Sequence, residues 1–133
     1  MIRGSCLCGG VNFEFSEARE FRNCHCSRCR KAKGSAFAAN IFVKPGNFCW
    51  TRGEELLTSY RLPSAQRFGN VFCKVCGSPM PRILPQIDSV VVPAGALDDD
   101  PKIRATHHIF AGSKAPWDTI SDGLPEYDAY PPS

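Results

Sequence analysis

The sequence predicts a mainly β fold of short strands with a long irregular C-terminal tail, in a single domain that spans residues 1–133. A chain of this length suffices for one modest hydrophobic core but not for two independent ones. Its 11 glycines and 11 prolines are spread along the chain, as in proteins rich in turns. No long stretch has the apolar repeat of an amphipathic helix, so short strands are the main expected elements.

The expected strands are short β-prone runs that end at proline, glycine or asparagine. The first, residues 11–15 (VNFEF), alternates apolar and polar residues with a period of two, as a half-buried strand does. The others, in chain order, are residues 35–43, 67–72, 89–93 and 103–110. Between them, residues 44–47 (KPGN) and 97–101 (LDDDP) are expected to form turns.

The tail begins at Gly112 and contains four prolines together with Trp117, Tyr127 and Tyr130. This proline content excludes regular structure over most of the segment. Its aromatic side chains are expected to pack part of the tail across the sheet.

Charge and hydrophobicity limit the classes of partner. The formal net charge of +3 is too small to indicate a nucleic-acid partner. Residues 1–10 lack the apolar stretch of a secretion signal, and no window approaches the roughly 18 apolar residues that a membrane span needs. We therefore expect a cytoplasmic protein with no membrane partner. In a reducing compartment, eight cysteines at close spacings indicate metal sites, with disulfides as the main alternative.

Two cysteine pairs carry the same signature. Cys6 and Cys8 form C-x-C-G, and Cys73 and Cys76 form C-x-x-C-G. The glycine after each pair can adopt a positive φ and leave backbone N–H groups free to point at sulfur. Because each pair offers too few sulfurs for a closed tetrahedral site, we predict that the four cysteines share one structural zinc. The alternative is four reduced, buried cysteines that act as small apolar residues.

A third group, Cys24, Cys26 and Cys29, differs because no glycine follows it and basic residues surround it. Those basic residues are Arg28, Arg30, Lys31 and Lys33. Three protein ligands with a vacant fourth position are typical of a reactive zinc site, so we predict a second, catalytic zinc here whose occupancy is open. The cations would attract an anionic ligand and favour thiolate, although they also fit a solvated surface.

Several other residues are weaker candidates. Cys49 lies between Phe48 and Trp50 and is expected to be a buried core cysteine, with ligation of the second metal as the alternative. His25 alternates with Cys24 and Cys26 and should point away from their metal. Ser113, Lys114, Trp117 and the pair His107 and His108 could line a pocket. We expect instead that Trp117 packs the tail, that one histidine of the pair is a core residue, and that Lys114 is solvated.

Four segments, taken together and in this order, resemble the glutathione-dependent formaldehyde-activating family over essentially the whole chain. They are CLCGGVNFEF from Cys6, NCHCSRCRKAKGSAFAANIFV from Asn23, FCKVCGSPM from Phe72 and IFAGSKAPWDTISDGLPEYDAYPP from Ile109. The resemblance implies a zinc-stabilised β-tent, a complex mixed-β fold shared with a Rab nucleotide-exchange chaperone and with methionine sulfoxide reductase B. It also implies a structural zinc bound by Cys6, Cys8, Cys73 and Cys76, and a catalytic zinc bound by Cys24, Cys26 and Cys29.

The activity that the resemblance implies is a carbon–sulfur lyase reaction, the formation of S-hydroxymethylglutathione from glutathione and formaldehyde. The partner would then be a small-molecule thiol, with glutathione the expected one. Two other functions remain open. One is a non-catalytic zinc-binding interaction module, since related domains bind proteins. The other is a thiol reductase that depends on Cys49.

Overall fold

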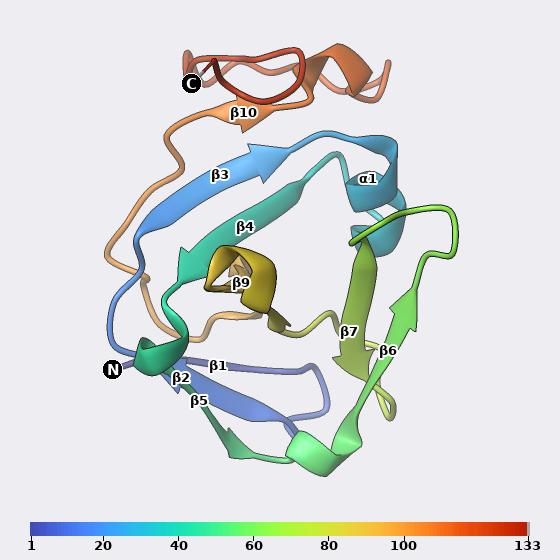
Figure 1. Ribbon diagram of the computed structural model, residues 1–133. Coiled ribbons are helices and arrows are strands. Elements are labelled where there is room, and N and C mark those ends of the chain that lie inside the picture. The colour runs from blue at the N-terminus through green and yellow to red at the C-terminus, as the bar shows by residue number, and fades with distance from the viewer. Residues whose placement is uncertain (133) are drawn as a thin grey trace.

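The computed structural model describes residues 1–132 of the chain, in which ten short strands form three sheets (Figure 1). The three-stranded sheet has the order β1-β2-β5, made of Ile2–Ser5, Asn12–Phe15 and Phe48–Arg52. The five-stranded sheet has the order β10-β3-β4-β9-β8, made of His108–Ile109, Glu20–Cys24, Ala38–Val43, Ser89–Pro93 and Arg82–Leu84. The third sheet pairs β6 (Leu57–Arg61) with β7 (Gly69–Cys73). The predicted mainly β fold of short strands is confirmed.

The core lies where the three-stranded and five-stranded sheets face each other. Alternate residues of β2, Phe13 and Phe15, are buried, as the period of two predicts. They pack in one cluster with apolar residues of β1, β4 and β9, which are Ile2, Ile41, Val43, Val90 and Val92. Because these side chains lie on one face of β4 and β9, the opposite face of the five-stranded sheet does not contribute to this core.

Four of the five predicted strands coincide with observed ones, namely β2, β4, β7 and β9. The fifth run, residues 103–110, forms a strand only at its end, in β10, so most of that prediction is wrong. Of this run, only His108 and Ile109 pair in register with β3. Phe110 has a φ of 54°, in the left-handed region, which ends the extended chain directly after Ile109.

Helical structure is limited to short pieces. One α-helix, α1 (Ser27–Lys33), ends at Gly34, whose φ of 59° suits a glycine C-cap. Within residues 1–132 there are five 3-10 helices: four lie between strands, at Pro45–Asn47, Glu54–Leu56, Pro85–Ile87 and Ala94–Ala96, and the fifth, Ala111–Ser113, follows β10. The first of them occupies the turn predicted at residues 44–47. Within residues 1–132, no helix is long and apolar enough to cross a membrane.

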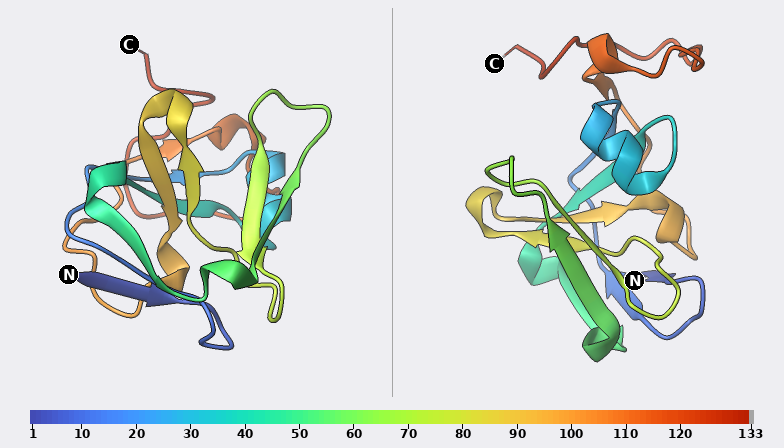
Figure 2. Two further views of the ribbon diagram at one scale, coloured as in Figure 1. Left: turned by 60° about the horizontal axis from the view of Figure 1, so that its bottom comes forward. Right: turned by 90° about the vertical axis from the view of Figure 1, so that its right-hand side faces the viewer.

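The C-terminal tail lies along β10, at one edge of the five-stranded sheet (Figures 1 and 2). It is held by backbone hydrogen bonds, including His108 N–H to Pro125 O (2.9 Å) and Tyr127 N–H to His108 O (3.0 Å). Tyr130 packs edge-on against Phe110. Trp117, however, is 71% exposed, so the expectation that it packs the tail down is wrong. The residue that is fully buried in this part of the tail is Ala115, and not Trp117.

Candidate metal centres and the adjoining cavity

The first cysteine cluster joins two turns that are far apart in the sequence. Cys6 and Cys8 lie in the turn after β1, while Cys73 ends β7 and Cys76 lies in the turn that follows. The four sulfurs all lie within 4.8 Å of one another, with Cys6 Sγ 3.6 Å from Cys8 Sγ and Cys8 Sγ 3.9 Å from Cys73 Sγ. Four thiolate donors at this spacing can hold a metal ion.

Both turns have the backbone form that the glycines predict. Gly9 and Gly77 have φ values of 77° and 75°. The Val11 N–H donates to Cys6 Sγ at 3.2 Å, so a backbone donor does point at sulfur. Ser78 connects the turns, because its Oγ accepts from Leu7 N–H at 2.9 Å and lies 3.3 Å from Cys76 Sγ. That hydroxyl contact lowers the pKa of the Cys76 thiol to about 5, which favours a ligating thiolate.

Replacing Gly77 by alanine is expected to destabilise the metal-loaded protein by about 1–2 kcal/mol, because an L-residue is strained at a positive φ. A Cβ at this position would contact nothing, so the loss would come from the backbone alone. Gly46→Ala is the matched control, since its Cβ would also be free and its φ is not positive. Urea denaturation measures both; equal free energies of unfolding for the two variants would contradict the assigned role.

The second cluster forms where β3 runs into α1. Cys24 ends β3, Cys26 is the N-cap of α1, and Cys29 lies in its first turn. The Cys26 sulfur accepts a hydrogen bond from Cys29 N–H at 3.3 Å, so capping the helix brings these two sulfurs together. All three sulfurs lie within 4.8 Å of one another, and within residues 1–132 no fourth cysteine, histidine or carboxylate joins them.

Crowding of the three sulfurs separates their pKa values. Contact with Cys24 lowers the pKa of Cys26, while the sulfur of Cys26 raises the pKa of Cys24. The neighbouring sulfurs of Cys24 and Cys26 raise the pKa of Cys29 most strongly. Three thiolates side by side therefore need a cation to offset their charge, and this requirement fits a metal ion.

Cys49 belongs to neither cluster, and the expectation that it is a buried core cysteine is wrong. It is exposed on β5, opposite Glu14 of β2. Its neighbours Phe48 and Trp50 point inward and pack against Phe13. Since side chains alternate along a strand, two inward aromatic residues leave the cysteine between them facing outward.

The histidines lie beside the second cluster without joining it. His25, which the sequence predicts to point away from the cysteines, is fully buried, and its Nε2 lies 2.8 Å from Nδ1 of His108. His108 Nε2 in turn lies 2.8 Å from a carboxylate oxygen of Asp122 in the tail. His108 is thus the inward-facing member of the histidine pair. His107 packs its ring against Tyr127 instead.

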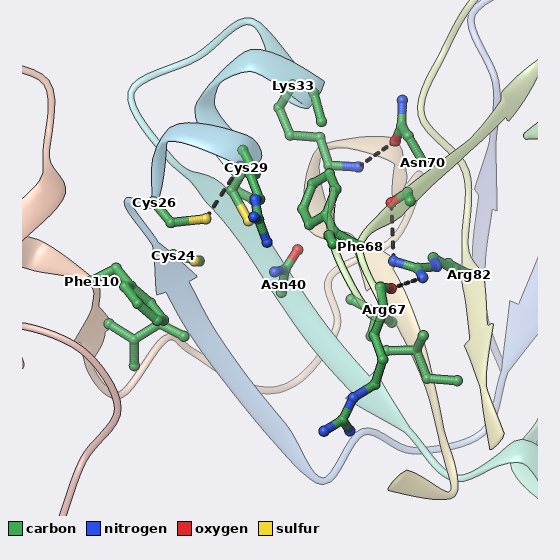
Figure 3. A pocket seen from close by; sticks show the side chains of 18 of the residues that line it. Cys24, Cys26, Cys29, Lys33, Asn40, Arg67, Phe68, Asn70, Arg82 and Phe110 are labelled. Carbon is green, nitrogen blue, oxygen red and sulfur yellow. Dashed lines mark hydrogen bonds between the residues drawn. The ribbon is translucent and has the colours of Figure 1, made fainter. Parts of the chain in front are cut away.

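A cavity of about 1000 Å³ adjoins the second cluster (Figure 3). Its floor is the face of the five-stranded sheet that the core does not use. Register brings Arg22 opposite Asn40 and Cys24 opposite Ala38 across β3 and β4, so cysteine, arginine and asparagine share this face. Phe42, Val91, Pro93, Arg82 and Leu84 continue it across β4, β9 and β8.

The cavity walls come from α1, from the loop between β6 and β7, and from the C-terminal segment after β10. Phe110 and, in the tail, Ser113 and Tyr130 line it, whereas Lys114 and Trp117 do not. Five lining residues are basic, namely Arg22, Arg28, Lys33, Arg67 and Arg82. Of the residues that the structure describes, no aspartate or glutamate lines the cavity. The space beside the three sulfurs is therefore suited to an anion.

The sequence identified only part of this wall. Arg28 and Lys33 line the cavity as predicted, but Arg30 and Lys31 do not. Lys33 Nζ donates to Asn70 Oδ1 at 3.3 Å, and burial lowers the pKa of its amine. The remaining polar lining, including Arg22, Arg67, Arg82, Asn40 and Asn70, comes from strands and a loop that no local motif marks.

The family model described as glutathione-dependent formaldehyde-activating enzyme matches residues 1–113. The chain belongs to this family. All cysteines of both clusters lie within the match, while the tail beyond Ser113 lies outside it, so the resemblance of residues 114–132 to the family stays a prediction.

No curated protein sequence matches the chain. Among solved structures, it is similar to the crystal structure of a Rhodobacter sphaeroides protein, with 28% sequence identity and a TM-score of 0.57. The similarity covers 75% of this chain and 92% of that one, so the likeness extends over most of the fold.

Proposed function

We propose that the protein is a zinc-dependent carbon–sulfur lyase that forms or cleaves a small thiol adduct, such as S-hydroxymethylglutathione. The observation that carries the proposal is the position of three cysteine sulfurs, with no fourth ligand from residues 1–132, in a cavity lined by cations. Family membership supports the same reaction, because the family is described as glutathione-dependent and formaldehyde-activating. Eight free cysteines favour a reducing compartment such as the cytoplasm.

Zinc is the metal that we propose for both clusters, since thiolate sulfur is among its preferred ligands. Cys6, Cys8, Cys73 and Cys76 offer a complete tetrahedral set, which fits a structural ion. Cys24, Cys26 and Cys29 offer three donors and leave one position to a ligand from outside the chain. When bound there, zinc would supply the positive charge that keeps an incoming thiol deprotonated.

The residues of the chain then hold the thiol in place for reaction. The basic lining attracts the anionic body of the thiol, and the position of the cysteine cluster sets where its sulfur lies. That sulfur adds to the carbonyl carbon of formaldehyde: a carbon–sulfur bond forms, the carbonyl π electrons move to oxygen, and the oxygen takes up a proton. Thiol and aldehyde thus combine without an oxidant or reductant. We assign no general base, and the main contribution expected is proximity.

Zinc-loaded protein is expected to accelerate exchange between glutathione and S-hydroxymethylglutathione by about 100-fold over buffer, because both reactants are held together. NMR exchange spectroscopy on mixtures of glutathione and formaldehyde measures this rate, and calorimetry measures glutathione binding. If zinc-loaded protein neither binds glutathione nor exceeds the rate in buffer, the lyase proposal is wrong. A stoichiometric macromolecular partner in a pull-down, retained by Cys26→Ser, would then support the non-catalytic module.

A further inference from the structure

Of the five cations that line the cavity, three are already engaged with other groups of the protein. Arg82 donates to Gly69 O at 3.0 Å and also to the carbonyl of Arg67. Arg22 pairs with Glu20 at 3.1 Å and lies over the ring of Phe42. Lys33 donates to Asn70, as described above. These three side chains shape the cavity but have part of their donor capacity in use.

Arg28 and Arg67 are the two whose side chains have no hydrogen-bond or ion-pair partner within residues 1–132. They occupy different walls. Arg28 lies in the first turn of α1, between Cys26 and Cys29 in the sequence. Arg67 lies in the loop between β6 and β7. Figure 3 shows its side chain apart from the hydrogen-bonded pair of Lys33 and Asn70, while Arg82 reaches only the backbone carbonyl of Arg67.

The backbone around Arg67 is fixed even though its side chain is free. Arg61 Nη2 donates to Gln66 O at 2.9 Å. Arg82 donates to the carbonyl oxygens of Arg67 and Gly69, the residues on either side of Phe68. Leu62 N–H also donates to Phe68 O at 3.0 Å, which closes the loop. These bonds hold the loop backbone, so binding a ligand would require ordering of the Arg67 side chain but not of the loop that carries it.

From this arrangement we infer that Arg67 binds the carboxylate at the glycine end of the thiol tripeptide, and so fixes its direction in the cavity. The inference rests on the function proposed above. A guanidinium matches a carboxylate through two parallel hydrogen bonds. The γ-glutamyl end carries an ammonium beside its carboxylate, and the described lining offers no aspartate or glutamate to pair with that charge. The glycine carboxylate has no such cation, so it is the better partner for Arg67.

S-methylglutathione and its glycine ethyl ester test the inference, because neither can donate a thiolate and their binding reports on the peptide body alone. Calorimetry on the zinc-loaded protein is expected to show about tenfold weaker binding of the ester by wild type, since one charge-assisted contact is lost. Arg67→Gln should bind S-methylglutathione about tenfold more weakly and the ester unchanged. Arg52→Gln, which removes an exposed arginine outside the cavity, is the matched control and should behave as wild type.

The assignment of Arg67 would be overturned if wild type did not bind S-methylglutathione, or if Arg67→Gln weakened the binding of S-methylglutathione and of its ester equally. It would also be overturned if Arg28→Gln, and not Arg67→Gln, abolished the difference in affinity between these two ligands. The exchange rate with formaldehyde separates this inference from the proposed function. Wild type could accelerate exchange between glutathione and S-hydroxymethylglutathione while Arg67→Gln still binds S-methylglutathione more tightly than its ester. In that case the inference about Arg67 fails and the proposed function stands.

Discussion

Replacing Cys26 by serine is expected to lower the zinc content from two ions to one per chain and to reduce the accelerated exchange by about 100-fold, back to the rate in buffer. The reason lies in the two roles of this residue. Its sulfur is one of the three that could hold a metal ion, and it also caps α1 by accepting from Cys29 N–H. Serine keeps the capping role, because its hydroxyl is a preferred N-cap acceptor, but it does not replace a thiolate as a zinc ligand.

Metal analysis of purified protein and NMR exchange measure the two effects, and thermal unfolding shows whether the fold survives. Cys49→Ser is the matched control, since it makes the same chemical change at a cysteine outside both clusters. It should keep two zinc ions and full activity. Two zinc ions in Cys26→Ser, or full activity with one, would show that the three-cysteine cluster is not the reactive site.

Prediction from sequence succeeded where the determining interactions are local. The spacing of Cys6 and Cys8, and the glycine after each pair, specify a turn within a few residues, and Gly9 and Gly77 have the expected positive φ. The division of seven cysteines into groups of four and three follows from the same short motifs. The alternation of apolar and polar residues predicts β2, because burying Phe13 and Phe15 on one face of the strand produces this period of two.

What the sequence did not reveal depends on contacts between distant segments. The floor of the cavity combines Arg22, Asn40 and Arg82, which lie on different strands and meet only through sheet register. The aromatic neighbours of Cys49 predict a buried residue, but alternation along β5 turns its side chain outward. The sequence does not predict α1, because a helix of seven residues is too short to show a clear apolar repeat.

Replacing Cys8 by serine is expected to destabilise the whole fold, by about 4 kcal/mol or more, because it opens the four-sulfur cluster. Cys8 is exposed, so the change creates no cavity in the core, and the loss would come from the metal site. This cluster ties the turn after β1 to the end of β7, and no strand of the β6-β7 sheet pairs with the three-stranded sheet within the described residues. Without the metal, the two sheets are joined only by the short connection from β5 to β6, by packing and by isolated hydrogen bonds.

Such a loss is a large share of the 5–15 kcal/mol or so that stabilises a typical domain, and it corresponds to a fall in Tm of about 10–20 °C. Thermal unfolding of Cys8→Ser, Cys26→Ser and Cys49→Ser under the same conditions measures it. The three variants make the same chemical change at one site in each cluster and at one outside both. Because α1 keeps its cap in Cys26→Ser, only Cys8→Ser should melt far below wild type. Equal melting temperatures for Cys8→Ser and Cys26→Ser would mean that the two clusters do not divide into a structural and a reactive site.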